Sequence, residues 1–343
     1  MTKNGFLIGL TVAASVGLAG AAQAQDMVFS SWGGTYQEGQ RLAMLDKAEE
    51  KYGVEIGEDS HTGLAAIKTQ VLSGQVNWDL VDLSTPDCER GRKDGLWEEL
   101  DYSLIPNAAN LDPAYRNPYW VGFITYSTVL AWNTETVANP PQGWADFWNV
   151  EEFPGKRAMR NRARDSLEVA LIADGVPLDG LYPIDMDRAY AKLEELKPDV
   201  DVWWSSGGQT AQMAIDNEVD MMMVWSGRIE NAIQEGATWD YTFVEGNIAV
   251  ECLVVPRGAE NAELAMKVIN EMLDPANQAE YTQYIPYGPV NDAAFDMGID
   301  AEKAAMLPSS PDNLAVQFVM NPDWWSPDEG EQAEARWTNF LQQ

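Results

Sequence analysis

The chain has 343 residues, of which 45% are hydrophobic, and a formal net charge of −32 at pH 7. This hydrophobic content predicts a folded globular protein of one or two domains rather than a disordered chain. So negative a surface repels nucleic acid and anionic lipid, which excludes both as partners, and it attracts cations at long range.

The first 24 residues have the features of a secretory signal peptide. Lys3 provides a positive charge, residues 6–22 form an apolar run, and Ala22-Gln23-Ala24 is a small-x-small cleavage site. The run is short and rich in Ala and Gly, and no stop-transfer charges follow it, so a retained membrane helix is the weaker alternative. We therefore expect a periplasmic mature protein without direct membrane insertion.

Short strands and helices alternate along the rest of the chain. The pattern predicts strands at residues 27–30, 54–56, 78–83, 123–133, 220–225 and 248–256, and helices at residues 36–52, 65–73, 187–196, 210–217, 263–273 and 330–341. This alternation is typical of an α/β fold with largely parallel sheets. Breaks near residues 139–143 and 245–258 bracket a block that we interpret as a second lobe inserted into the first. Ligands of such folds lie beyond the carboxyl ends of strands, so the cleft between two lobes is the expected site.

Two cysteines and one histidine limit the possible chemistry. Cys88 and Cys252 allow a single disulfide in an oxidising compartment, or two buried thiols. His61 lies in a polar, loop-like stretch, where we expect it on the surface. With no CxxC motif and one histidine, we expect no zinc site, no other metal and no cofactor. A secreted hydrolase using paired carboxylates is the distant alternative, and we expect no enzymatic activity.

Several residue types near predicted strand ends suit a small amine ligand. Aromatic rings cover methylene groups and attract cations, and carboxylates pair with ammonium groups. Arginines could instead clamp a ligand carboxylate, and residues 205–209 (SSGGQ) resemble an anion-binding nest that lacks the lysine of a P-loop. The candidates are the aromatics Trp32, Tyr36, Trp203, Trp204, Trp225 and Tyr287, the acids Asp82, Asp165 and Glu251, the arginines Arg160, Arg162, Arg164 and Arg228, and Ser206 of the nest. Glu251 stands out because it interrupts an apolar run.

The order of several short stretches resembles the periplasmic solute-binding proteins of ABC transporters, of the spermidine/putrescine type. These stretches are residues 31–37 (SWGGTYQ), 78–82 (WDLVD), 130–134 (LAWNT), 144–148 (WADFW), 153–157 (FPGKR), 203–207 (WWSSG), 224–228 (VWSGR) and 255–258 (VPRG). The resemblance implies a two-lobed fold of type II that closes over its ligand by hinge motion, a permease partner and a monomer. Residues 25–132 and 250–307 would form lobe 1, and residues 133–249 and 308–343, with the C-terminal helix, lobe 2.

The resemblance also implies roles for particular residues. Trp32 and Tyr36 match the first binding loop, and Glu251 matches a carboxylate that binds an amine. Ser84 matches a loop serine, and Trp225 matches an aromatic wall. Tyr287 matches a tyrosine near the hinge, and Asp165 matches a second acid.

Two departures change the expected ligand. Ala249 stands where a stacking Trp is common, and Arg162 stands where a further acid can occur. We therefore expect a putrescine- or spermidine-like amine, with a zwitterionic ω-amino acid or a quaternary amine as the alternative. Arg162 or Arg228 would then bind the carboxylate of the amino acid.

Overall fold

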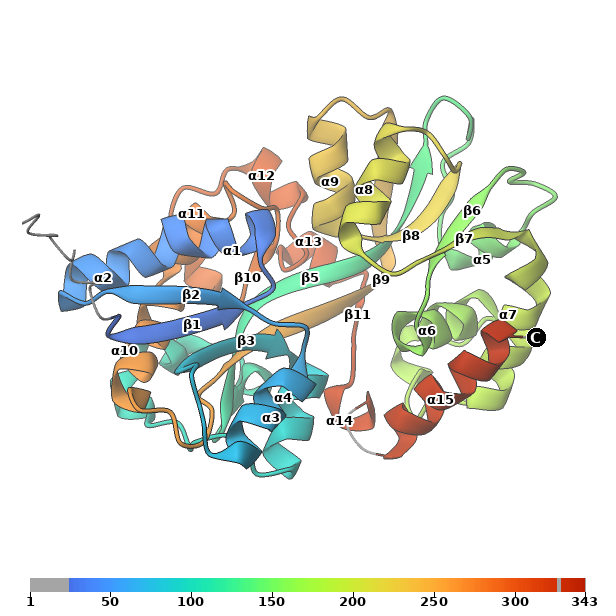
Figure 1. Ribbon diagram of the computed structural model, residues 1–343. Helices are drawn as coiled ribbons and strands as arrows, with labels where there is room; N and C mark the ends of the chain where they lie inside the picture. The colour runs from blue at the N-terminus through green and yellow to red at the C-terminus, as the bar shows by residue number, and fades with distance from the viewer. Residues whose placement is uncertain (1–24, 326–327, 343) are drawn as a thin grey trace, which may run out of the picture.

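The computed structural model describes residues 25–325 and 328–342, so the predicted signal peptide lies outside the described residues. Two sets of parallel strands are joined by two long antiparallel strands, in the order β2-β1-β3-β9-β5-β8-β6-β7 (Figure 1). The strands are β1 (Met27–Ser31), β2 (Ile56–Ser60), β3 (Leu80–Ser84), β5 (Trp120–Asn133), β6 (Arg157–Arg160), β7 (Val200–Trp204), β8 (Met221–Trp225) and β9 (Trp239–Val254), with the short β4 (Arg116–Asn117), β10 (Gly288–Pro289) and β11 (Phe318–Val319) on β5 and β9.

The long strands β5 and β9 pass from one set of strands to the other. β3 pairs with β9 only from Glu251 to Val254, whereas β8 pairs with β5 only from Thr128 to Trp132. The register between β5 and β9 shifts between Thr128 and Leu130, where the strands leave the first set and enter the second. The result is a two-lobed α/β fold, as predicted, with crossing strands between the lobes (Figure 1).

Helices cover both faces of each half of the sheet (Figure 1). In the first lobe they are α1 (Gly34–Gln40), α2 (Asp46–Tyr52), α3 (Leu64–Ser73), α4 (Thr85–Lys93), α10 (Ala262–Met272) and α11 (Pro275–Tyr281), with the short α12 (Ala301–Ala305) and α13 (Pro311–Leu314) after them. The second lobe has α5 (Trp144–Trp148), α6 (Ala163–Ala173), α7 (Met186–Leu196), α8 (Gly207–Ile215), α9 (Ser226–Gln234) and α15 (Asp328–Gln342). Separate apolar clusters lie under α3 and α4 and under α8 and α9, whereas the remaining layers of both lobes share one large cluster.

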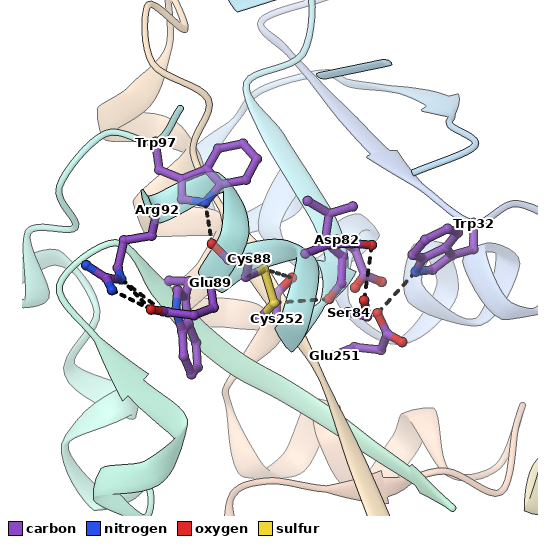
Figure 2. The surroundings of a disulfide bond; sticks show 12 residues. Trp32, Asp82, Ser84, Cys88, Glu89, Arg92, Trp97, Glu251 and Cys252 are labelled. Atoms are coloured by element: carbon purple, nitrogen blue, oxygen red, sulfur yellow. Dashed lines mark hydrogen bonds and ion pairs between the residues drawn. A yellow bond between two sulfur atoms is a disulfide. The ribbon is translucent and has the colours of Figure 1, made fainter. Parts of the chain in front are cut away.

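A disulfide joins Cys88 of α4 to Cys252 of β9, with Cα atoms 6.7 Å apart (Figure 2). Both residues are fully buried and lie in the cluster that packs α3 and α4 onto the sheet. Trp97 Nε1 donates to the carbonyl of Cys88 at 2.7 Å, which ties the following loop to the same place. The bridge therefore fixes α4 to the strand that carries Glu251.

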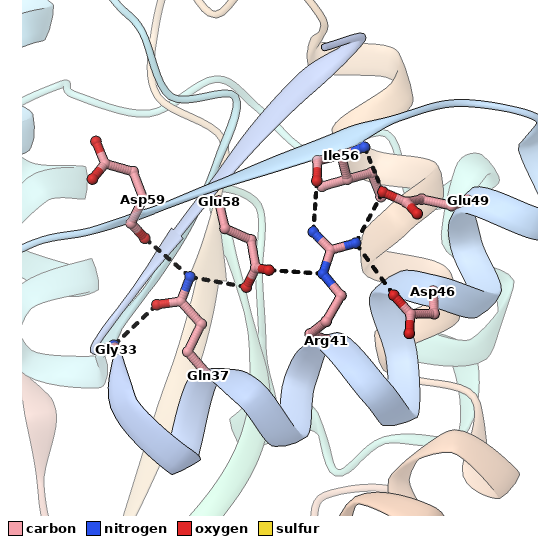
Figure 3. A network of polar contacts seen from close by, with 8 residues as sticks. All are labelled: Gly33, Gln37, Arg41, Asp46, Glu49, Ile56, Glu58 and Asp59. Atoms are coloured by element: carbon pink, nitrogen blue, oxygen red, sulfur yellow. Dashed lines mark hydrogen bonds and ion pairs between the residues drawn. The ribbon is translucent and has the colours of Figure 1, made fainter. Parts of the chain in front are cut away.

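Polar contacts fix the start of α1 (Figure 3). The Gly33 N–H donates to Gln37 Oε1 at 3.0 Å, and Gln37 Nε2 donates to Glu58 Oε1 of β2 at 3.1 Å. One turn later Arg41 pairs with the other Glu58 oxygen at 2.7 Å and with Glu49 Oε1 at 2.9 Å. Gly33 has φ 71°, a conformation that favours glycine, so the chain turns sharply from β1 into the helix. These contacts set the position of the loop between β1 and α1.

The C-terminal segment crosses between the lobes a third time. β11 pairs with β9 at Asn247 and Ile248, and α14 (Pro322–Trp325) then packs on α4 of the first lobe. Helix α15 returns to the second lobe and packs on α6, while its Glu331 pairs with Arg90 of α4. This segment, residues 318–342 without 326–327, is called the strap below.

Some elements differ from the sequence prediction. β2 begins at Ile56, whereas the strand was predicted at residues 54–56. β9 begins at Trp239, whereas the strand was predicted to begin at residue 248. Strands β6 and β7 and helices α6 and α9 were not predicted. The first half of β9 alternates exposed and buried residues at the rim of the sheet, so it lacks the continuous apolar run that marked its second half.

Candidate functional site

Side chains from both lobes meet where β1, β3, β6 and β8 end and where β5 and β9 cross. This is the edge at which ligands of open α/β sheets bind. The first lobe contributes acids and hydroxyls, and the second contributes arginines. The residues that the structure brings together are Trp32, Tyr36, Gln40, Asp82, Ser84, Tyr126, Arg160, Arg164, Asp165, Trp225, Arg228, Glu251 and Tyr287.

Asp82 lies at the floor of the first lobe's side and is fully buried. Its Oδ2 accepts hydrogen bonds from Gln40 Nε2 at 2.7 Å, Tyr36 Oη at 2.8 Å and Ser31 Oγ at 3.1 Å. Its Oδ1 and Gln40 Oε1 are buried without a hydrogen-bond partner among the described residues. Burial raises the pKa of Asp82 to about 7, although the three donors oppose this shift.

Glu251 is the second acid of this wall. It lies opposite Ser84 in the β3–β9 pairing, so its side chain is on the same sheet face as those of Ser84 and Asp82. Glu251 Oε2 accepts from Trp32 Nε1 at 3.2 Å (Figure 2). Burial, and next the charge of Asp82, hold the pKa of Glu251 well above its ordinary value. The side chain that interrupts an apolar run in the sequence therefore faces the site.

His61 is buried, which corrects the prediction of a surface histidine. Its Nδ1 accepts from the Gly63 N–H at 3.1 Å, so Nε2 carries the proton and lies 2.8 Å from the carbonyl of Asp82. Its ring meets the Trp32 ring edge-on, with centroids 4.5 Å apart. The polar sequence around His61 concealed this packing, which supports the indole that holds Glu251.

Asp165 does not offer a free carboxylate to an amine, in contrast to its predicted role. One oxygen pairs with Arg160, and the other accepts from Asn247 Nδ2 at 2.8 Å. The Arg160 guanidinium lies 4.9 Å from the centre of the Trp225 ring. Asp165 therefore holds Arg160 in place, and Arg160 covers one side of Trp225.

Arg164 and Arg228 are the two arginines of the site without an ion-pair partner among the described residues. Arg164 is buried, its Nη1 lies 3.5 Å from Ser84 Oγ of the first lobe, and its Nε has no hydrogen-bond partner among the described residues. The Nε of Arg228 likewise has none. Within the described part of the chain, no carboxylate forms an ion pair with either guanidinium, whereas Arg162 is exposed at the start of α6. Both unpaired arginines can therefore bind a ligand carboxylate.

Four aromatic rings connect the two walls. The ring centroids of Trp225 and Tyr126 are 6.2 Å apart, those of Tyr126 and Tyr287 6.0 Å, and those of Tyr287 and Tyr36 6.0 Å. Trp225 Nε1 is buried without a partner among the described residues. Such a chain of rings suits the methylene groups of a short ligand.

Four predicted site residues lie outside the site. Arg162 is exposed, and Trp203 packs edge-on against Trp337 and Phe340 of α15. Trp204 is fully buried, donates to the carbonyl of Met223 at 2.8 Å, and packs edge-on behind Trp225 at 5.2 Å. Strand alternation turns it into the core of the second lobe. Ser206 is exposed and caps α8 by accepting from the Gln209 N–H at 3.3 Å. It is a helix cap, not a ligand contact.

Sequence reasoning missed Gln40, Tyr126 and the particular role of Arg164. Gln40 is four residues after Tyr36 on one helix, so a shared face was readable from the spacing. Tyr126 carried no signal beyond its place in a long strand. In the described part of the chain, no group of three or more His, Cys, Asp or Glu residues could hold a metal ion. No helix there is long and apolar enough to cross a membrane.

The chain is similar in sequence to known bacterial solute-binding proteins. The model of the family described as bacterial extracellular solute-binding protein matches residues 43–308. A gamma-aminobutyric acid (GABA)-binding protein of Pseudomonas aeruginosa is 35% identical over 336 residues, covering 96% of this chain and 94% of that protein. The spermidine/putrescine-binding periplasmic protein of Escherichia coli is 29% identical over 277 residues, covering 78% and 77%.

Solved structures show the same fold. An ABC transporter substrate-binding protein from Bradyrhizobium japonicum is 48% identical, with a TM-score of 0.89 and coverage of 92% of this chain and 99% of that one. A GABA receptor structure is 34% identical, with a TM-score of 0.85 and coverage of 92% and 97%. The chain therefore belongs to the bacterial extracellular solute-binding proteins, the ligand-capturing components of ABC importers.

Proposed function

We propose that this protein captures a short ω-amino acid of the GABA class in the periplasm and delivers it to the permease of an ABC importer. One observation carries the proposal. Among the site residues of the first lobe, the buried polar atoms without partners are the acceptors Asp82 Oδ1 and Gln40 Oε1. The second lobe's side has three such donors, Arg164 Nε, Trp225 Nε1 and Arg228 Nε, and one such acceptor, Asn247 Oδ1, beside Asp165. A ligand with an ammonium group at one end and a carboxylate at the other satisfies both sets.

The same polarity disfavours the other ligands considered. The second ammonium of putrescine or spermidine would face Arg164 and Arg228, and the related polyamine binders are more distant in sequence than the GABA-binding protein. A quaternary amine offers no N–H donor to Asp82 and Glu251. A zwitterion therefore fits better than a polyamine or a betaine.

Capture by closure follows from where the ligand groups bind. The carboxylate would bind to the second lobe and the ammonium to the first, so the ligand contacts both lobes only when they are closed. The Arg164–Ser84 contact already crosses between the lobes. Differential affinity for the closed form then drives closure. In this proposal the protein is a monomer that binds its ligand without turnover and releases it unchanged.

Isothermal titration with GABA, 5-aminovalerate, putrescine, spermidine, glycine betaine and butyrate tests the proposal. We expect GABA or 5-aminovalerate to bind most tightly. Arg164→Gln should weaken that binding about 100-fold because a buried guanidinium–carboxylate contact is lost. The matched control is Arg162→Gln, an exposed arginine two residues away, which should bind within threefold of the wild type. Tighter binding of putrescine than of either amino acid would contradict the proposal.

A further inference from the structure

Two acidic side chains share the first lobe's wall without a basic partner. Asp82 and Glu251 face the same way from neighbouring strands, and both are buried. In the described part of the chain, neither forms an ion pair with a lysine or arginine. Two like charges in a buried site strongly disfavour joint ionisation, so such a pair retains a proton.

The groups around Asp82 are neutral. Ser31 of β1 and Tyr36 and Gln40 of α1 donate to its Oδ2, and Tyr281 of α11 lies behind Tyr36, with ring centroids 6.2 Å apart. His61 reaches only the backbone carbonyl of Asp82, and burial lowers the pKa of this histidine, so it stays neutral above pH 6.5. The buried oxygens Asp82 Oδ1 and Gln40 Oε1 lack a donor, which is what a carboxylic acid proton at Asp82 would supply.

The groups around Glu251 carry mixed charge. They are Trp32 from the loop after β1, Asp87 of α4, Tyr126 of β5, Tyr287 next to β10, and Arg164 of α6. Arg164 is the one cation that acts on Glu251 in this set, and Asp87 opposes it. The Arg164 guanidinium contacts Ser84 Oγ at 3.5 Å rather than either acid, so it lowers the pKa of Glu251 without forming an ion pair with it.

We propose that the ligand-free Asp82–Glu251 pair holds one proton, and that capture of a ligand ammonium group releases this proton to solvent. The inference rests on the proposed function for the amine of the ligand. The exchange balances because R–NH₃⁺ enters with its charge, one H⁺ leaves, and no bond of the ligand breaks. The proton is then a competitor of the ammonium group, and affinity depends on pH.

The expected effect is measurable. Burial raises the pKa of Asp82 to about 7, so with Asp82 as the acid that gives up the proton, ligand affinity should fall about 30-fold between pH 8 and pH 5.5. The ligand does not titrate in this range, because model carboxyl and amino groups have pKa values of about 4 and about 10. At pH 6 close to one proton should be released per ligand bound.

Titration of GABA at several pH values gives the pH dependence, and titration at pH 6 in phosphate and in MES counts the protons released, because the two buffers differ in ionisation enthalpy. We expect release by the wild type, and a smaller release with a weaker pH dependence in Asp82→Asn, in which Glu251 is the remaining buried acid of the pair. Glu168→Gln is the matched control. Glu168 is also a buried acid whose pKa burial raises to about 7, but it is hydrogen-bonded to Tyr182 and Trp325 outside the site. This control should retain the wild-type pH dependence.

Binding of GABA without proton release and with equal affinity at pH 5.5 and pH 8 would overturn the inference while leaving the proposed function intact. If no amino acid binds, the proposed function fails, and the shared proton is then tested by the thermal stability of the ligand-free protein. The thermal midpoint of Asp82→Asn relative to the wild type should rise from pH 5 to pH 8, since the wild type must ionise one more buried acid than the variant. A gap that stays constant with pH would overturn the inference independently of any ligand.

Discussion

At the scale of single residues, Gly227 leaves room for Tyr287 at the site. A Cβ atom built on Gly227 would lie 2.5 Å from Tyr287 Cε1, far closer than two carbon atoms can approach. Tyr287 is fully buried against Tyr36 and Tyr126, so its ring has little space into which to move. The glycine of the WSG sequence after β8 therefore determines the shape of the aromatic wall.

Gly227→Ala should weaken ligand binding at least tenfold, because the displaced Tyr287 ring would enter the space of the ligand. Isothermal titration of the best ligand measures the effect. Gly208→Ala is the control, since a Cβ at Gly208 meets nothing within 4 Å, and it should bind as the wild type does. Equal affinities of the two variants would show that Tyr287 does not border the ligand.

The sequence identified some site residues because their chemistry conflicted with their surroundings. Glu251 was visible as an acid in an apolar run, and Trp32 and Tyr36 as aromatics beside a glycine turn. The choice between Arg162 and Arg164 depends on a local kink. Asp165 has φ 73°, outside the helical region, and this conformation buries Arg164 while Arg162 stays exposed. No pattern in the sequence indicated that kink.

At the scale of elements, the disulfide connects a helix to the central strand that carries an acid of the site. Cys252 follows Glu251 directly in β9, and Cys88 lies in α4, whose Asp87 accepts from Ser84 Oγ at 3.2 Å. The bridge spans a sequence separation of 164 residues. By loop-closure entropy, so long a loop predicts a stabilisation of about 5 kcal/mol, and measured values are commonly 2–5.

Replacing both cysteines by serine should lower the free energy of unfolding by about 2–5 kcal/mol. Urea unfolding of the variant and the wild type measures the difference. The wild type treated with a reductant should move in the same direction, which separates loss of the bridge from poor packing of serine. A variant as stable as the wild type would contradict the stabilising role of the bridge.

Helices and strands could be predicted where their apolar residues repeat with a clear period. The crossing strands were harder to predict. The helices predicted at residues 65–73, 187–196 and 263–273, the last of them as amphipathic, are present as α3, α7 and α10. β5 and β9 serve both lobes, so their burial changes along their length and their ends cannot be read from one period. β6 is only four residues long and contains two arginines, which conceal a buried strand.

At the scale of the whole molecule, the strap binds to the second lobe through a buried acid. Glu168 Oε1 accepts from Trp325 Nε1 and from Tyr182 Oη, each at 2.7 Å, while Oε2 has no partner among the described residues. Burial, and next the charge of Asp165, raise the pKa of Glu168 to about 7 from 4.5. The folded state thus retains a proton that the unfolded state loses above pH 4.5, and stability falls as pH rises from 4.5 through 7.

Glu168→Gln removes this titration and should therefore stabilise the protein at pH 8 by up to about 3 kcal/mol, with little change at pH 5. Urea unfolding at the two pH values measures the difference. A stability difference that is the same at pH 5 and pH 8 would show that Glu168 does not change its protonation on unfolding.

The crossing strands also constrain the order in which the chain can fold as it emerges with its N-terminus first. β9 lies between β3 and β5 in the sheet but is synthesised after β6, β7 and β8. Until residues 239–254 emerge, the nascent first lobe has open strand edges, which are templates for pairing with other chains. Cys88 cannot form its disulfide until Cys252, 164 residues further along the chain, is available. A chain that stalls before β9 should therefore require chaperone protection, whereas stalling after it should not.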